Sequence, residues 1–299
     1  MKMRILTLPF MIAAALSAAA QTDADFRLHE LISRPLRGGP KAIAAYVSDI
    51  RAAVKDGADP NLALNGKTPM DLADEISWDW QQANARQELT LAGAKASPEQ
   101  AQHMLMFAVV YGYPPFVKQA LACGAKPDDF IEGESDIYWH CCGYSYLYTL
   151  LRGFECHYDG EPTECLQQML SAGANPNIRN RKDGMVPLLC YRCTPEQVAL
   201  LLAHGADANA TDAEGRNVLM LRFRYQFPHR CEELISILTA AGLNLNHRDS
   251  QGRTVMDYAR VIQNAALQSK SEHPDTLKRN AAIISQLRAL GAKTADELQ

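Results

Sequence analysis

The eight cysteines are the side chains of this 299-residue chain whose number and spacing most clearly indicate chemistry. All of them lie between Cys123 and Cys231, and none occurs in the first 122 residues. An even set of cysteines confined to one region is typical of proteins that form disulfides in an oxidising compartment. We therefore expect an exported protein with disulfides in its middle third.

Two pairs of cysteines are separated by short segments. Cys156 and Cys165 enclose eight residues that include an Asp-Gly pair and a proline. Such a loop can bring two helix ends together, so we predict a disulfide between them. Cys190 and Cys193 are three residues apart, on one face of a predicted helix, and are expected to reach partners in a neighbouring unit rather than each other.

Cys141 and Cys142 are adjacent, and a bond between them would need a strained ring, so we expect each to have a separate partner. Eight cysteines permit 105 pairings, so the connectivity stays open. Zinc is a second chemistry for the same region, because Cys190 and Cys193 with two further ligands could form a tetrahedral site. The further ligands would come from His140, Cys141, Cys142 and His157. Disulfides are favoured over zinc because the second cysteine pair is adjacent rather than spaced.

No motif of a known catalytic chemistry occurs in the chain. There is no Gly-x-Ser-x-Gly, His-Glu-x-x-His, phosphate-binding glycine loop or dinucleotide fingerprint. A redox-active Cys-x-x-Cys is disfavoured because Cys190 is expected inside its helix, away from the helix start that lowers a thiol pKa. We therefore expect a protein that is not an enzyme and that has no cofactor.

The N-terminus and the overall charge indicate where the protein is located. Lys2 and Arg4 precede an apolar stretch that ends in small residues near Ala20, the pattern of a signal peptide over residues 1–20. We expect its removal to leave a protein of the periplasm or the cell exterior, without membrane insertion. The 30 basic and 34 acidic residues give a net charge of −4, which argues against nucleic acid as a partner.

A short phrase recurs seven times along the chain, six times with Gly-Ala and once with Gly242-Leu243. Its glycines are spaced 36, 31, 49, 32, 37 and 49 residues apart. Each follows an amphipathic run that predicts a helix, and a glycine there ends the helix because it adopts the left-handed conformation without steric cost. The seven glycines are Gly57, Gly93, Gly124, Gly173, Gly205, Gly242 and Gly291.

A second phrase falls between these glycines and has a turn followed by a helix start. Asn65-Gly66 and Asp183-Gly184 favour tight turns, and Thr68-Pro69 is suited to open a helix, with threonine as the cap and proline in the first helical position. Related phrases begin at Glu214 and Gln251. The predicted unit is therefore a turn, a helix, a short link, a second helix and a glycine stop.

The two phrases together resemble the ankyrin repeat, with its Gly-x-Thr-Pro-Leu-His and Gly-Ala-Asp-x-Asn patterns at a period near 33. The match is best from Gly173 to Asp212, and no copy keeps the histidine. The resemblance implies an all-α solenoid of about six to seven helix-turn-helix units. It predicts an array over residues 38–293 after an N-terminal cap at 21–37, with an insert at about 128–165 and a C-terminal tail at 294–299.

Candidate binding residues lie where the repeat is interrupted or elaborated. Arginine and aromatic side chains dominate the energy of many protein interfaces, and they gather in the insert, at a predicted hairpin tip and at one helix end. The concave face of units three to five is the expected surface. The candidates are Tyr138, Trp139, Arg179, Arg181, Arg222, Arg224, Tyr225 and Phe227.

The resemblance also implies a function, because ankyrin arrays are mostly protein-recognition modules. We expect an exported, monomeric protein that binds another protein, as an immunity or helper protein of the cell envelope. The alternative is a redox or metal-binding envelope protein that uses the central cysteines.

Overall fold

The computed structural model describes residues 21–77, 79–132, 141–153, 161–225, 230–268 and 274–298. These residues form thirteen α-helices and two short 3-10 helices, with no β-strand among them. The described chain is therefore all-helical, as predicted. It divides into two compact units, one built from residues up to Met104 with Ala122–Gly124, the other from Leu105–Leu121 with the residues from Ala125 on. The division falls inside the segment 38–293 that was predicted as one array.

The first unit consists of two helix pairs. Helices α2 (Asp23–Ser33) and α4 (Pro69–Asp74) contact each other, as do α3 (Pro40–Lys55) and α5 (Asp79–Leu91). Leu28, Ile32, Tyr46, Ile50 and Leu89 are fully buried between them. Helix α6 (Pro98–Tyr111) begins in this unit and ends in the second one.

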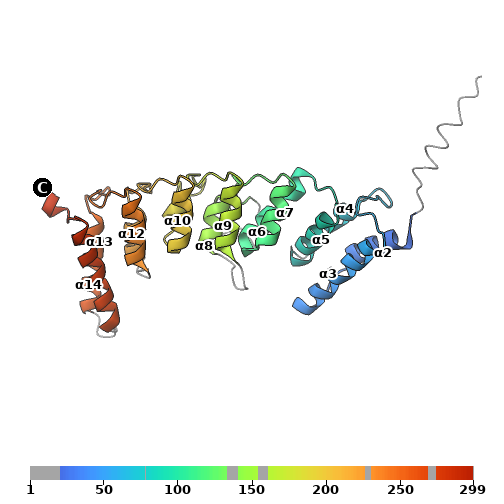
Figure 1. The fold of residues 1–299 in the computed structure, drawn as a ribbon, viewed down its shortest axis with the longest axis horizontal. Helices are drawn as coiled ribbons and strands as arrows, with labels where there is room; N and C mark the ends of the chain where they lie inside the picture. Colours follow the sequence, from blue (N-terminus) through green and yellow to red (C-terminus); the bar gives the residue numbers. More distant parts are fainter. Residues whose placement is uncertain are drawn as a thin grey trace, which may run out of the picture. The chain divides into compact units, whose positions relative to one another are not determined.

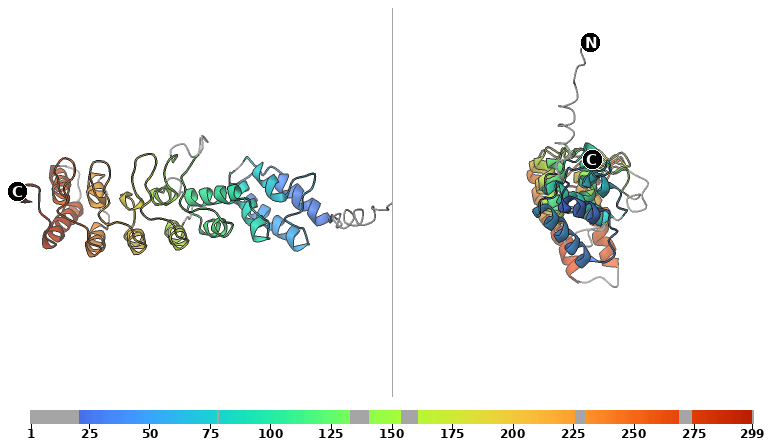
Figure 2. Two further views of the ribbon diagram at one scale, coloured as in Figure 1. Left: turned by 90° about the horizontal axis from the view of Figure 1, so that it is seen from above. Right: turned by 90° about the vertical axis from the view of Figure 1, so that its right-hand side faces the viewer.

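The second unit stacks its helices in two rows, which Figures 1 and 2 show from yellow-green to red. The first row is α8 (Tyr146–Arg152), the 3-10 helix η1 (Pro187–Leu189), α11 (Val218–Arg224) and α13 (Val255–Gln268). The second row is α9 (Pro162–Ser171), α10 (Pro195–Ala203), α12 (Cys231–Ala240) and α14 (Pro274–Ala289). Each member contacts the next along its row. The unit also contains α7 (Pro114–Ala122) up to Leu121, and its last described element is η2 (Asp296–Leu298).

The two long intervals between glycines have different structures. The second long interval, from Gly242 to Gly291, contains longer helices than the repeat before it. Helix α13 has 14 residues and α14 has 16, against 7 in α11 and 10 in α12. In the first, α8 lies within the predicted insert at 128–165 and takes the place of a first-row helix. Phe130 pairs with Ser145, the residue that caps α8.

All seven glycines of the repeated phrase have positive φ, between 84° and 102°, as the prediction of left-handed helix stops requires. The residue after each glycine donates its N–H to a carbonyl five residues earlier. At Gly205, for example, Ala206 donates to Leu201 over 2.9 Å. This is the glycine-terminated helix end in which otherwise unpaired carbonyls are satisfied.

Asparagine side chains near the end of the same phrase link each repeat to the next one along the chain. We call this series of hydrogen bonds the asparagine ladder. The Asn209 side-chain amide donates to the carbonyl of Gly242 over 3.0 Å, and its oxygen accepts the N–H of Asn244 over 2.8 Å. Asn61, Asn177 and Asn246 make the same two bonds to the following glycine stop. Each of these asparagines therefore fixes the distance and register between its own unit and the next.

Replacing Asn209 with alanine is expected to lower the free energy of unfolding by about 1–2 kcal/mol, because two hydrogen bonds between units are lost at about 0.5–1.5 kcal/mol each. Urea unfolding followed by circular dichroism measures the change. Gln167→Ala is the matched control, since that exposed amide bonds only Ser171 within its own helix. Equal midpoints for Asn209→Ala and the control would show that the ladder adds nothing to stability.

Candidate functional site

Two tyrosines from successive first-row elements stack against each other in the second unit. Tyr191 follows η1, and Tyr225 is the residue that ends α11. Their ring centroids are 4.4 Å apart and the ring planes differ by 24°. Tyr225 is 51% exposed although it is a large aromatic residue. The stack therefore presents aromatic surface to solvent in a fixed orientation.

A buried arginine of α11 holds the backbone that carries Tyr191. Arg222 is only 2% exposed, and its guanidinium donates to the carbonyls of Tyr191 over 2.8 Å and of Cys193 over 2.7 Å. It thereby ties α11 to the turn that carries Tyr191. The prediction of Arg222 as a surface binding residue is wrong, because its side chain is buried and its guanidinium binds two backbone carbonyls of the preceding repeat.

Two exposed cations flank the stacked tyrosines. Arg192 follows Tyr191 and Arg224 precedes Tyr225, and both are exposed. The guanidinium of neither arginine forms a hydrogen bond or an ion pair with a residue that the structure describes. Arg230 is different, because it pairs with Glu196 over 2.7 Å and with Glu233 over 2.8 Å. We call Tyr191, Arg192, Arg224 and Tyr225 the tyrosine face. Its cations remain available to a carboxylate supplied from outside.

A mainly apolar groove lies beside Arg224, between α11 and α13. Its volume is about 180 Å³. Val261 on its rim is 65% exposed, whereas Phe223 in its floor is buried. We call it the α11–α13 groove, and it can receive an apolar side chain next to the tyrosine face. Its lining residues are Phe223, Arg224, Arg253, Asp257, Tyr258, Val261, Ile262 and Ala265.

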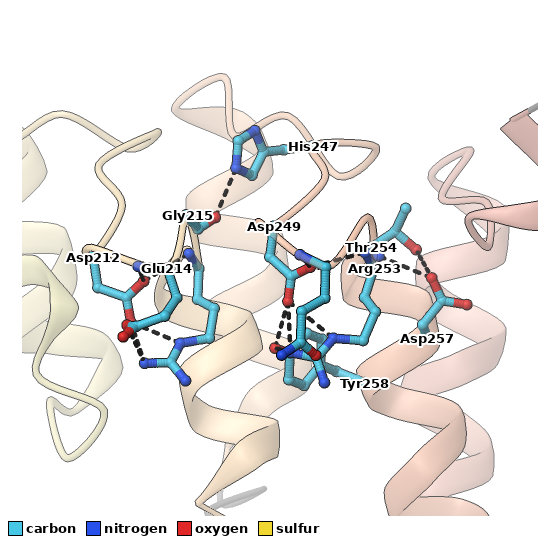
Figure 3. Close-up of polar contacts among 11 residues, drawn as sticks. Asp212, Glu214, Gly215, His247, Asp249, Arg253, Thr254, Asp257 and Tyr258 are labelled. Carbon is cyan, nitrogen blue, oxygen red and sulfur yellow. Dashed lines mark hydrogen bonds and ion pairs between the residues drawn. The ribbon is translucent and has the colours of Figure 1, made fainter.

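The turns before α11 and α13 are fixed by buried carboxylates (Figure 3). Asp212 pairs with Arg216 over 2.6 Å, and Arg216 also reaches Glu214 over 2.7 Å. The ring of His247 contacts the carbonyl of Gly215 over 2.8 Å, which connects the two turns. These polar groups bond to one another. The turns therefore form a rigid support for α11 and α13 and do not present unpaired charges to a ligand.

Asp249 is the most enclosed of these carboxylates, with a side chain 1% exposed. It accepts hydrogen bonds from the Arg253 side chain over 2.7 Å, the Tyr258 hydroxyl over 2.7 Å and the Gln251 N–H over 2.9 Å. Burial raises the pKa of the Asp249 carboxyl, but these hydrogen bonds outweigh burial and hold its pKa below the usual value. Burial together with the Asp249 contact raises the pKa of Tyr258 to about 12.

The lowered pKa of Asp249 predicts a loss of stability in acid. A carboxyl whose pKa is lower in the folded state stabilises the protein above its unfolded pKa, and this contribution disappears as the pH falls through the folded pKa. We expect Asp249→Asn to cost about 2 kcal/mol at pH 7, since hydrogen bonds to a charged group contribute about 1.5–3 kcal/mol. The difference from wild type should narrow below about pH 4.

Thermal unfolding of both proteins from pH 7 to pH 2.5 measures this difference. Asp49→Asn is the matched control, because that carboxylate is 46% exposed and lies 3.9 Å from Arg34. If the unfolding temperatures of wild type and Asp249→Asn differed by the same amount at every pH in this range, the ionised carboxylate would not be the source of the stability difference.

Arg179 and Arg181, the predicted binding residues on a hairpin tip, are exposed but bind other groups of the same chain. Arg179 donates to the carbonyl of Gly184 over 2.9 Å in its own turn. Arg181 pairs with Glu132 and lies 4.1 Å over the ring of Phe130, in the preceding turn. Both arginines therefore stabilise turns. Tyr138, Trp139 and Phe227 lie outside the described residues.

The seven cysteines among the described residues form no disulfide with one another. Cys141 and Cys165 are buried and Cys142 is exposed, while Cys156, the predicted partner of Cys165, lies outside the described residues. The expected helical position of Cys190 and Cys193 is wrong. Cys190 follows η1 and Cys193 precedes the cap of α10, because the first-row element of this unit is a single 3-10 turn.

The described ranges contain neither a metal-binding cluster nor a membrane-spanning helix. No group of three or more His, Cys, Asp or Glu side chains there is arranged to hold a metal ion. His140 and His157, two of the ligands considered for zinc, fall in segments that the structure does not describe. No described helix has the length and apolar composition needed to cross a bilayer.

Of this candidate surface, the sequence pattern pointed to Arg224 and Tyr225 but not to Tyr191, Arg192 or the α11–α13 groove. A signal for Tyr191 was present, since it precedes Tyr225 by 34 residues, about one repeat. The groove gave no such signal, because Val261 and Ile262 read as ordinary positions of an amphipathic helix.

Comparison of the sequence with protein-family models gives no match, and comparison with curated proteins gives none either.

Proposed function

We propose that the chain is an exported ankyrin-repeat protein that acts without catalysis by binding another protein through the tyrosine face. The observation that carries this proposal is the stacked pair Tyr191 and Tyr225, flanked by the unpartnered cations Arg192 and Arg224. Tyrosine and arginine are the residues most enriched where binding energy concentrates. The hydrogen bonds of Arg222 hold the backbone that carries Tyr191, so little conformational entropy is lost when a partner binds.

The repeated architecture supports the ankyrin assignment. The second unit repeats one pattern, which consists of a turn, a first-row element, a second-row helix and a left-handed glycine. The asparagine ladder joins these repeats at intervals near 33 residues. Stacked units of this kind offer an extended surface on one row of helices. The tyrosine face and the α11–α13 groove both belong to the first row.

The charge of the face defines the partner. Arg192 and Arg224 have no carboxylate from the described chain, so an acidic segment of the partner would pair with them. An aliphatic or aromatic side chain of that segment would enter the α11–α13 groove. The proposed partner is therefore a protein that presents an apolar anchor next to carboxylates. Export rests on the predicted signal peptide, residues 1–20, and the proposed location is the periplasm or the cell exterior.

Capture from an envelope extract of the source cells tests the proposal. Immobilised mature chain, residues 21–299, should retain one protein in stoichiometric amount. The double variant Tyr191→Ala with Tyr225→Ala should lose it. Tyr113→Ala is the matched control, because that tyrosine is 39% exposed elsewhere in the same unit. Retention of the same proteins by all three baits, or of none by any, would contradict the proposal.

A further inference from the structure

The segment Cys190-Tyr191-Arg192-Cys193 is a four-residue turn closed by its own backbone. The N–H of Cys193 donates to the carbonyl of Cys190 over 3.1 Å. A turn of this type brings its first and fourth Cα atoms within about 7 Å. Disulfide-bonded cysteines have Cα atoms about 4.4–6.8 Å apart, so this backbone can carry a bond between the two sulfurs.

The two side chains of this turn already contact each other. Cys190 is 1% exposed and Cys193 is fully buried. The Cys193 thiol donates to the carbonyl of Pro187 over 3.9 Å. The proximity of the two cysteine side chains lowers the pKa of Cys190 and raises the pKa of Cys193. The two sulfurs therefore share one site that water does not reach, and Cys190 is the first of them to form a thiolate.

The surroundings hold the turn from both sides. Cys190 donates its N–H to Pro187 over 3.0 Å, which closes η1, and Thr194 begins α10 with a capping box. The Arg222 guanidinium donates to the carbonyls of Tyr191 and Cys193. The turn is thus fixed in the conformation that keeps the two sulfurs together.

We propose that Cys190 and Cys193 form a disulfide with each other in the exported protein. The oxidant is a disulfide, either a small molecule such as oxidised glutathione or the active site of a thiol oxidase. The Cys190 thiolate attacks one oxidant sulfur, and the other leaves as a thiolate that takes up a proton. Cys193 then loses its proton and attacks the Cys190 sulfur of this mixed disulfide. The second oxidant sulfur leaves as a thiol, so two cysteine thiols are oxidised and one disulfide is reduced.

Burial sets when this reaction takes place. An oxidant cannot reach sulfurs enclosed as these are, so oxidation occurs while the chain folds or during local opening of the turn. Once formed, the bond is shielded from reductants by the same packing. It constrains the turn that presents Tyr191 and Arg192, and it is independent of whether the tyrosine face binds a partner.

The position of Arg192 makes the disulfide directly detectable. Trypsin cuts after Lys182, Arg192 and Arg216, so the two cysteines fall in separate peptides, 183–192 and 193–216, each with one cysteine. The full chain is exported, alkylated under denaturing conditions without reductant, digested and analysed by mass spectrometry. We expect 183–192 and 193–216 as a linked pair in most molecules, separated only after reduction.

Two variants separate this pairing from others. Cys231→Ser should leave the linked pair unchanged, although Cys231 is buried beside Arg222 and is the other candidate within this cluster. Cys193→Ser should leave peptide 183–192 alkylated. Alkylation of both wild-type peptides, or linkage of either one to a different cysteine peptide such as 231–248, would overturn the proposal.

Discussion

Replacing Arg222 with alanine is expected to lower the free energy of unfolding by about 3–5 kcal/mol, whereas replacing Arg224 should change it by less than about 0.5 kcal/mol. The two arginines are two residues apart on the same helix, but Arg222 is 2% exposed and Arg224 is exposed. The Arg222 guanidinium makes charged hydrogen bonds to two carbonyls, which its loss would leave without this donor. The buried aliphatic stem adds packing that alanine cannot replace.

Urea unfolding of both single variants against wild type measures the difference. Arg222→Met keeps most of the stem volume without the charge, and should recover part of the loss. Equal stabilities of Arg222→Ala and Arg224→Ala would contradict the structural role of Arg222. A normal fold with the tyrosine stack displaced would indicate that Arg222 positions Tyr191 without stabilising the unit.

Tyr225→Ala is expected to weaken binding of the captured partner by about 2 kcal/mol, or about 30-fold in Kd. Tyr225 contributes exposed aromatic area and also orders Tyr191 through the stack, so its removal affects both rings. Arg224→Ala should have a smaller effect that disappears at high salt, because an exposed charge acts through a screened field.

Titration of the partner into each variant by calorimetry gives these constants. Tyr113→Ala should bind like wild type, since an exposed tyrosine alone is not sufficient for binding. Wild-type affinity for Tyr225→Ala would exclude the tyrosine face as the binding surface, while leaving the Cys190–Cys193 proposal untouched.

The helical fold could be predicted because its signals are local. A glycine after an amphipathic run has few alternatives to a left-handed helix stop, and all seven glycines have the required φ. Thr68 likewise caps α4 with Pro69 in the first turn, as its sequence indicates. These features depend on residues within a few positions of each other.

The role of Arg222 could not be predicted because it depends on residues far along the chain. Its hydrogen-bond acceptors lie 29 and 31 residues earlier, and only their arrangement in space distinguishes Arg222 from Arg224. The asparagines of the ladder pose the same problem. Their phrase could be recognised in the sequence, but the carbonyl that each binds belongs to the next unit.

The turn at Cys190 shows a different limit. The apolar stretch Val186–Cys190 is compatible with an amphipathic helix, and a helical position for both cysteines followed from it. The structure has only the three-residue η1 there, after which the chain turns into α10. The length of a first-row element depends on how its neighbours pack, so periodicity over five residues could not determine it.

Hydrogen–deuterium exchange of the mature chain, with and without its captured partner, tests the central claim most directly. The account predicts slower exchange on binding at residues 187–194, 218–225 and 258–265, which carry the tyrosine face and the α11–α13 groove. The second-row helices α9, α10 beyond its first turn, α12 and α14 should exchange as in the unbound chain. Protection confined to the second row, or absent from the first, would contradict the claim that this protein recognises its partner through the tyrosine face.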